Sequence, residues 1–336
     1  MFSNNFVRSI ALACALVFGL LIATPASAAM VKQQKPFAEY LEPIPVAGFL
    51  LLVGPSTSYV GPGDIVSGSI GWYSCARVYN AAAATISTSM CDLVDSAAPT
   101  VVVCTLRGSS TGYVDLTAYC PGSTTPAALC ATKTGGKCNV SQMYDQSGSS
   151  HPMVEATASV QPVLVFSSLN GLPGITGVTA NNTILGTSAT ITQTQPFSTS
   201  GVFKRTSVSG NFDAVMGLSL VGAILFGGGT TTGKASIDDD TIYSPASPAM
   251  PENAFTAMQA FYSGTSSLLT IDGTDSATGY AGTYGISGTV RIFRGNACCT
   301  MTGTIMETGI WNASFSSGNR TAMNANQHSA TVGYNF

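Results

Sequence analysis

Charged residues are scarce in this sequence of 336 residues, and the two signs almost balance. Only 9% of the residues are Asp, Glu, Lys or Arg, and 13 basic residues against 16 acidic ones give a formal net charge of −3. No basic run stands out, so the composition gives no reason to expect nucleic acid or an anionic membrane as a partner. Few charges among many Gly, Ser and Thr residues favour sheets and turns over solvated helices.

Histidine is also scarce, and the common metal and nucleotide motifs are absent. His151 and His328 are the only histidines, they are isolated, and no CxxC pair occurs, which argues against zinc. Neither histidine lies next to a GxSxG motif, the nucleophile signature of serine hydrolases. The segment FGGGTTTGK (226–234) fails the phosphate-loop pattern because Ala235 follows its lysine. We therefore expect no metal and no cofactor.

Long apolar runs are few, and the first lies at the N-terminus. Arg8 precedes the apolar run at 10–23, and Ala-Ser-Ala follows at 26–28. This pattern predicts a signal peptide over 1–28 and a secreted or periplasmic protein. The run is too short and wrongly flanked for a membrane anchor. Glycines interrupt the second apolar run, at 214–229, so we expect two buried strands there and no membrane span.

Cysteine is well represented by contrast, with nine residues in the chain. Cys14 would be lost with the signal peptide, which leaves an even set of eight. An even number of cysteines in a secreted chain usually indicates disulfides. We expect a disulfide-stabilised domain.

Short apolar segments separated by Gly, Ser, Asn, Asp and Pro predict an all-β domain of antiparallel strands. After an N-terminal extension over 29–60, a single domain should occupy 61–336. The helical spacing of apolar residues predicts a helix over 71–86, and serine caps predict a short one over 316–327. Asp-Gly in IDGTDS (271–276) predicts a hairpin turn. The strands are expected at 99–106, 160–167, 188–194, 266–273, 287–295 and 302–311.

Several segments, taken in order, resemble the catalytic domain of family 54 glycoside hydrolases, the α-L-arabinofuranosidase B type. They are GPGDI (61–65), the loop between Cys130 and Cys138, MYDQSG (143–148), QP (161–162) and NGLPGI (170–175). The C-terminal stretch 303–327 is similar to that family's last strand and helix.

The resemblance implies a concanavalin A-like (jelly-roll) antiparallel β-sandwich with a few short helices. It also implies a carbohydrate partner, an arabinose-containing glycan, and hydrolysis of terminal arabinofuranosyl groups by two carboxylates. In the cysteine-bounded loop we expect a Cys130–Cys138 disulfide. The other early cysteines should then pair among themselves in one of three ways: Cys75, Cys91, Cys104 and Cys120.

The most unusual acidic cluster is SIDDDTIYS (236–244), where adjacent carboxylates can raise one another's pKa. Its position resembles the family segment that carries the nucleophile, which implies that role for Asp239. Asp238 and Asp240 are then candidate proton donors, together with Asp272. An exposed turn and a weak calcium site are the alternatives for this cluster.

The segment RGNACCTMTG (294–303) occupies the place of the family's acid loop, and Asn296 stands where the family has its proton donor. Asparagine cannot donate that proton, which favours a non-catalytic, lectin-like carbohydrate-binding or surface protein. A purely structural envelope protein is a third possibility. Cys298 and Cys299 resemble the adjacent cysteines that form a disulfide platform under the sugar in this family. Separate partners for the two are the alternative.

Two further carboxylates have structural interpretations. Asp145 in YDQSG can accept hydrogen bonds from amides two residues on, as in Asx turns, and Ser147 can act likewise. We therefore interpret this segment as a structural corner, with a catalytic Asp145 as the alternative. Glu307 is expected to anchor the final strand.

Overall fold

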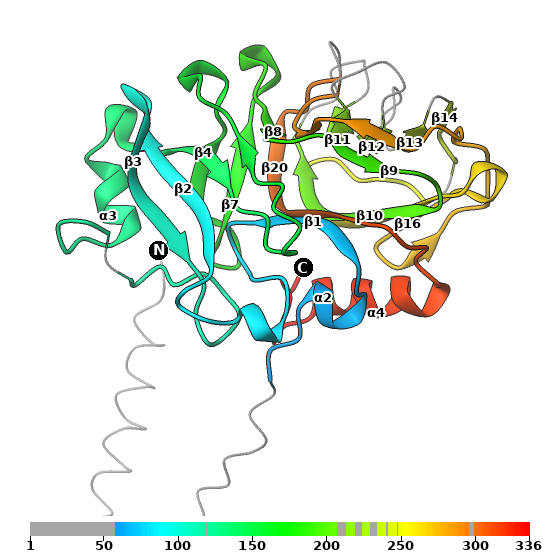
Figure 1. Ribbon diagram of the computed structural model, residues 1–336, viewed down its shortest axis with the longest axis horizontal. Helices are drawn as coiled ribbons and strands as arrows, with labels where there is room; N and C mark the ends of the chain where they lie inside the picture. Colours follow the sequence, from blue (N-terminus) through cyan, green and yellow to red (C-terminus); the bar gives the residue numbers. More distant parts are fainter. Residues whose placement is uncertain are drawn as a thin grey trace, which may run out of the picture. The chain divides into compact units, whose positions relative to one another are not determined.

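The computed structural model describes residues 58–118, 120–206, 213–218, 224–228, 234–239, 241–246, 248–295 and 299–336, with the backbone alone for 224–228 (Figure 1). The predicted signal peptide and nearly all of the predicted extension lie outside these residues. Within them, no helix is both long and apolar enough to cross a membrane.

The strands form two antiparallel runs. The first run, in order of pairing, is β17 (Thr274–Asp275), β16 (Leu268–Ile271), β15 (Phe255–Tyr262), β10 (Phe197–Arg205) and β20 (Gly303–Trp311). On its other edge, β20 pairs with both β1 (Ser69–Ser74) and β7 (Leu172–Gly177). The second is β3 (Ala98–Arg107), β2 (Ser89–Asp95), β4 (Asn139–Met143), β5 (Met153–Val154), β8 (Leu185–Thr187), β19 (Val290–Ile292), β11 (Asp213–Leu218), β12 (Ile224–Gly228), β13 (Ala235–Asp239) and β14 (Ile242–Tyr243).

Strand β6 (Val163–Leu169) pairs with both β4 and β7 and so joins the two runs, while β9 (Ile191–Gln193) and β18 (Ile286–Gly288) form a separate pair. In Figure 1 the layer with β10 and β16 lies below the layer with β11, β12 and β13. One apolar core contains buried side chains of both, such as Phe197 and Met258 from the first run and Val215 and Ile292 from the second. The predicted β-sandwich is confirmed.

The expected strands are present, including two in the apolar run at 214–229, now β11 and β12. The Asp-Gly hairpin is confirmed as well, since Asp272 and Gly273 join β16 to β17 with positive φ angles of 46° and 80°.

The helices are short: α2 (Pro62–Ile65), α3 (Pro126–Ala131) and α4 (Ser317–His328), with 3₁₀ turns at Ala81–Ala83, Thr134–Gly136, Ala158–Val160, Thr179–Asn181 and Gly264–Ser266. The predicted C-terminal helix is confirmed as α4, whose cap Ser316 accepts a hydrogen bond from the amide of Asn319.

The helix predicted over 71–86 is wrong. Residues Ser69–Ser74 form strand β1, and only Ala81–Ala83 make a short 3₁₀ turn. Trp72 and Tyr73 point to opposite faces of β1, yet both are fully buried because each face is covered. Pairing with the buried strand β20 therefore overrides the helical spacing of the apolar residues.

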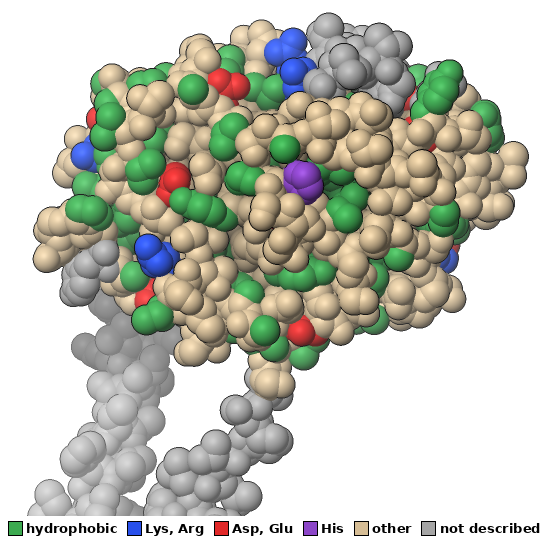
Figure 2. Space-filling view, in the orientation of Figure 1, with side chains coloured by type: hydrophobic (Ala, Val, Ile, Leu, Met, Phe, Trp, Pro, Cys, Tyr) green, Lys and Arg blue, Asp and Glu red, His purple; other side chains and the backbone are tan. Residues whose placement is uncertain are grey.

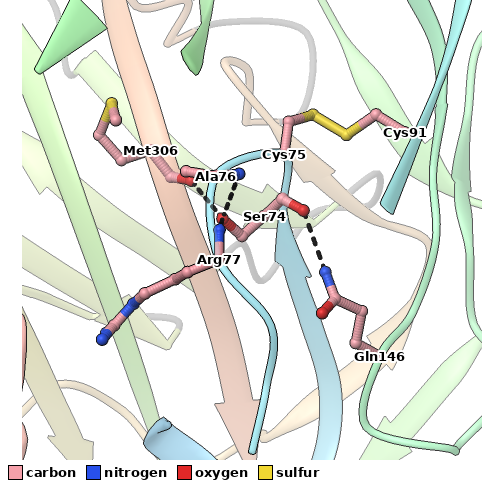
Figure 3. Close-up of a disulfide and its surroundings, with 7 residues drawn as sticks. All are labelled: Ser74, Cys75, Ala76, Arg77, Cys91, Gln146 and Met306. Carbon is pink, nitrogen blue, oxygen red and sulfur yellow. Dashed lines mark hydrogen bonds between the residues drawn. A yellow bond between two sulfur atoms is a disulfide. The ribbon is translucent and has the colours of Figure 1, made fainter. Parts of the chain in front are cut away.

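Three disulfides link the early part of the domain: Cys75–Cys91, Cys104–Cys120 and Cys130–Cys138. The expected Cys130–Cys138 bond and the pairing of the other four among themselves are both confirmed. Figure 3 shows the first bridge next to Ser74, whose hydroxyl donates to the carbonyl of Met306 and accepts from the amides of Ala76 and Arg77. This residue fixes the chain just where it leaves β1.

Arg77, three residues after Ser74, forms a fully buried ion pair with Glu307 of β20. Its Nε and Nη2 atoms lie 2.5 and 2.8 Å from the two carboxylate oxygens, and both side chains are 0% exposed. Tyr334 and Gln327 also donate to this carboxylate, at 2.8 and 2.9 Å. Burial alone would lower the pKa of Arg77, but the carboxylate of Glu307, together with Tyr59 and Tyr334, outweighs burial and raises the pKa. Glu307 anchors the final strand, as expected.

We predict that Arg77→Ala destabilises the domain by about 3–5 kcal/mol, because it leaves the Glu307 carboxylate buried without its countercharge. The matched control is Arg107→Ala, which removes an exposed arginine and should change the free energy of unfolding by less than about 0.5 kcal/mol. Urea denaturation of both variants measures the difference. Equal, small losses would contradict the importance of the buried pair.

Candidate functional site

Asp239, the predicted nucleophile, is the last residue of β13 and is fully buried. Both of its carboxylate oxygens accept from the amide of Gly285, at 3.0 and 2.9 Å, and the side-chain amide of Gln195 donates to one of them. Its own amide donates to the carbonyl of Ala281, at 2.6 Å. The carboxylate therefore connects β13 to the loop at 279–285 and to the connection between β9 and β10.

Asp238, one candidate proton donor, is half-buried on the same strand. Neighbouring residues of a strand face opposite sides, so the side chains of Asp238 and Asp239 leave β13 in different directions. Asp240, the other neighbouring candidate, lies outside the described residues.

Asp272, the third candidate proton donor, lies in the hairpin turn between β16 and β17 and ties this turn to β15. Its carboxylate accepts from the amide of Ala257, at 2.8 Å, and lies 3.3 Å from Nε2 of His328. Ala257 stands near the start of β15, whereas Gln195, which donates to Asp239, accepts from the amide of Gly264, just beyond the end of that strand. Asp272 therefore lies well away from the acidic cluster.

Of the three residues predicted to contact the sugar, one lies within the described residues. Asn296 and Cys298 are outside the described residues, but Cys299 is 7% exposed and its carbonyl accepts from the amide of Ala214, at the start of β11. The strand register aligns Ala214 with Gly227 of β12 and, through it, with Ser236 of β13, the strand that Asp239 ends. Asp239 is thus about 10 Å further along β13 than Ser236, and β13 lies two strand spacings, about 10 Å, from β11.

The structure thus does not bring Cys299 together with Asp239. Cys299 forms a disulfide whose partner lies outside the described residues, so the adjacent bridge with Cys298 stays a prediction.

The YDQSG corner is confirmed. One oxygen of Asp145 accepts from the amide and the hydroxyl of Ser147, at 2.9 and 2.6 Å, and from the amide of Trp72, at 3.1 Å. Its other oxygen accepts from the amide of His151. These bonds tie the corner to β1, so all of them serve structure.

Tyr262, the last residue of β15, belongs to the core. It is fully buried and stacks on Phe197 with ring centroids 4.3 Å apart. Burial raises the pKa of Tyr262 well above its ordinary value, and the charges of Asp239 and Asp238 raise it further. The phenol therefore stays neutral.

No group of three or more His, Cys, Asp or Glu side chains that could hold a metal ion occurs within the described ranges. Sequence reasoning missed Gln195 and the loop at 279–285, which hold the carboxylate of Asp239. An amide side chain and backbone amides carry no motif, so only the folded chain identifies them.

No protein-family model and no curated protein matches this sequence. Solved structures do match. A mutant GH54 α-L-arabinofuranosidase soaked with 4-nitrophenyl α-L-arabinofuranoside matches with a TM-score of 0.59 and 14% identity. An arabinofuranosidase complexed with arabinofuranosyl-α-1,2-xylobiose matches with a TM-score of 0.54 and 15% identity.

Each match covers 79% of this chain and 64% of the other, so this chain spans less than two thirds of the length of those proteins. At such low identity the likeness concerns the fold. It confirms the sandwich architecture that the sequence resemblance implied.

We predict that Asp239→Ala destabilises the domain by about 1–3 kcal/mol, because the buried amide of Gly285 loses its acceptor. Hydrogen–deuterium exchange should accelerate within 279–286, and urea denaturation should register the loss. Asp95→Ala, which removes an acid at the end of β2, should leave exchange in that loop unchanged. Slow exchange at Gly285 in the Asp239 variant would contradict this role.

Proposed function

We propose that the protein is a secreted carbohydrate-binding protein that recognises an arabinose-containing glycan without cleaving it. Three features support this proposal: a sandwich fold shared with arabinofuranosidase structures, three disulfides suited to an extracellular protein, and a weakly charged surface. On the face drawn in Figure 2, charged side chains are few and uncharged polar groups prevail. Such a surface suits a neutral, hydroxyl-rich ligand.

The burial and the hydrogen bonds of Asp239 argue against cleavage. A nucleophile must present a lone pair to the anomeric carbon of the sugar, but this carboxylate is 0% exposed and accepts hydrogen bonds from Gly285 and Gln195. Asparagine at position 296 supports the same conclusion, because it cannot protonate a leaving group.

Hydrolysis of terminal arabinofuranosyl groups is the second candidate, favoured by an acidic segment that resembles the family's nucleophile segment in a chain with the same fold. In that mechanism Asp239 attacks the anomeric carbon, and Asp238 or Asp240 protonates the leaving oxygen. Asn296, Cys298 and Cys299 would contact the sugar. The loop would have to release the carboxylate of Asp239 first.

Binding and turnover assays separate the two candidates. We expect affinity electrophoresis to detect binding to linear arabinan, while neither arabinan nor 4-nitrophenyl α-L-arabinofuranoside is hydrolysed above the uncatalysed rate. Turnover that Asp239→Asn abolishes would establish the hydrolase instead. Absence of both binding and turnover would refute the proposed function.

Restoring the acid tests the hydrolase further. If the protein cleaves only the aryl substrate, whose leaving group needs no proton, Asn296→Asp should raise arabinan turnover by up to about 10²–10⁴-fold. Asn296→Ala is the control and should give no increase. No gain with the aspartate would contradict a proton donor at this position.

A further inference from the structure

The loop at 279–285 exposes two aromatic rings. Tyr280 is 44% and Tyr284 69% exposed, and they are the only aromatic residues among the strongly exposed large hydrophobic side chains of the described chain. Between and beside them, Ala281, Gly282 and Gly285 are buried. Exposed rings that lie so close in sequence form a candidate binding surface.

The backbone between the two rings is held in place. The carbonyl of Ala281 accepts from the amide of Asp239, and the carbonyl of Gly282 accepts from the side chain of Gln195, at 2.6 and 2.9 Å. Gln195 in turn accepts from the amide of Gly264, at 2.6 Å. Together with the bond from Gly285 to Asp239, these contacts anchor the loop from both sides.

A third ring supports the start of the loop. Tyr243 of β14 donates to the carbonyl of Ala277, at 2.5 Å, and its ring packs so closely on Gly279 that an added Cβ would lie 2.0 Å from it. The two exposed tyrosines thus extend from a supported base.

Charge identifies the class of ligand. Residues 276–290 contain no charged side chain, and among the described residues the carboxylate of Asp239 accepts a hydrogen bond from the loop. Phosphates or uronic acids would find no cation within the loop itself and a buried negative charge behind it. Tyrosine rings combine an apolar face with a polar hydroxyl and suit neutral sugars, which have apolar C–H faces and hydroxyl edges.

We propose that Tyr280 and Tyr284 form a platform on which the rings of a neutral glycan stack, and that Asp239 and Gln195 are positioning residues for it. This inference rests on the proposed function and names the residues that recognise the glycan. Preordering the loop reduces the entropy that is lost when the ligand binds. The carboxylate of Asp239 thus contributes to recognition without touching the sugar.

Isothermal titration with an arabino-oligosaccharide tests the platform. Tyr280→Ala/Tyr284→Ala should weaken binding by about 5- to 150-fold, since aromatic contacts contribute about 0.5–1.5 kcal/mol each. Tyr280→Phe/Tyr284→Phe keeps both rings and should retain most of the affinity. Val101→Ala, at a residue 59% exposed on strand β3, is the control and should bind as the wild type does. An anionic polygalacturonate oligomer should bind at least about tenfold more weakly than the neutral one.

The outcomes separate this inference from the proposed function. If the wild type binds the oligosaccharide and the double alanine variant binds equally well, the platform is refuted and the proposed function stands. If the wild type binds no neutral glycan, both are refuted. Equal loss in the phenylalanine and alanine variants would show that the hydroxyls, and not the ring faces, recognise the ligand, which would also overturn the stacking platform.

Discussion

The buried pair of Arg77 and Glu307 is the interaction on which the rest of the sandwich depends. It joins the segment after β1 to the middle of β20, which is buried along its whole length. Asn326 of α4 accepts from Arg77, at 2.7 Å, and also donates to the carbonyl of Val60. One charged group thus connects the start of the described chain, the central strand and the last helix (Figure 1).

Such a pair is costly to bury, and it is tolerated because every part of it has a partner. The guanidinium donates to Glu307, to Asn326 and to the carbonyl of Val332. Gln327 links the carboxylate onward to Ser200 and Gln259, on β10 and β15. The network therefore lies between α4 and the first run of strands and fixes how the helix packs on them.

Asp239 plays a comparable part in another region of the sandwich. A carboxylate that accepts backbone amides can order an irregular loop that has no strand partner of its own. Here the ordered loop presents two tyrosines, while the carboxylate stays inside. The most acidic segment of the sequence is therefore interpreted as structural support for a binding surface.

Local signals in the sequence predicted local structure well. Asp272–Gly273, the cap Ser316 and the corner at Asp145 are each determined by neighbours a few residues away, and the structure confirms all three. The resemblance gave the sandwich and the Cys130–Cys138 bridge. The helix over 71–86 failed because pairing with the distant strand β20 makes Ser69–Ser74 a strand, which local spacing cannot reveal.

The candidate site was less predictable because its contacts are distant in sequence. Asp239 contacts Gly285 and Gln195, which are 46 and 44 residues away in the sequence. A run of three aspartates gives no sign that one of them is buried. The exposure of Tyr280 and Tyr284 likewise depends on which residues of their loop turn inward. Aromatic residues in a β-rich sequence usually pack in the core, as Tyr262 does.

A crystal structure of the protein with a bound arabino-oligosaccharide tests the central claim most directly. The account predicts sugar rings against Tyr280 and Tyr284, with the carboxylate of Asp239 still accepting from the amide of Gly285. A sugar whose anomeric carbon is bonded to, or in line for attack by, the carboxylate of Asp239 would contradict it.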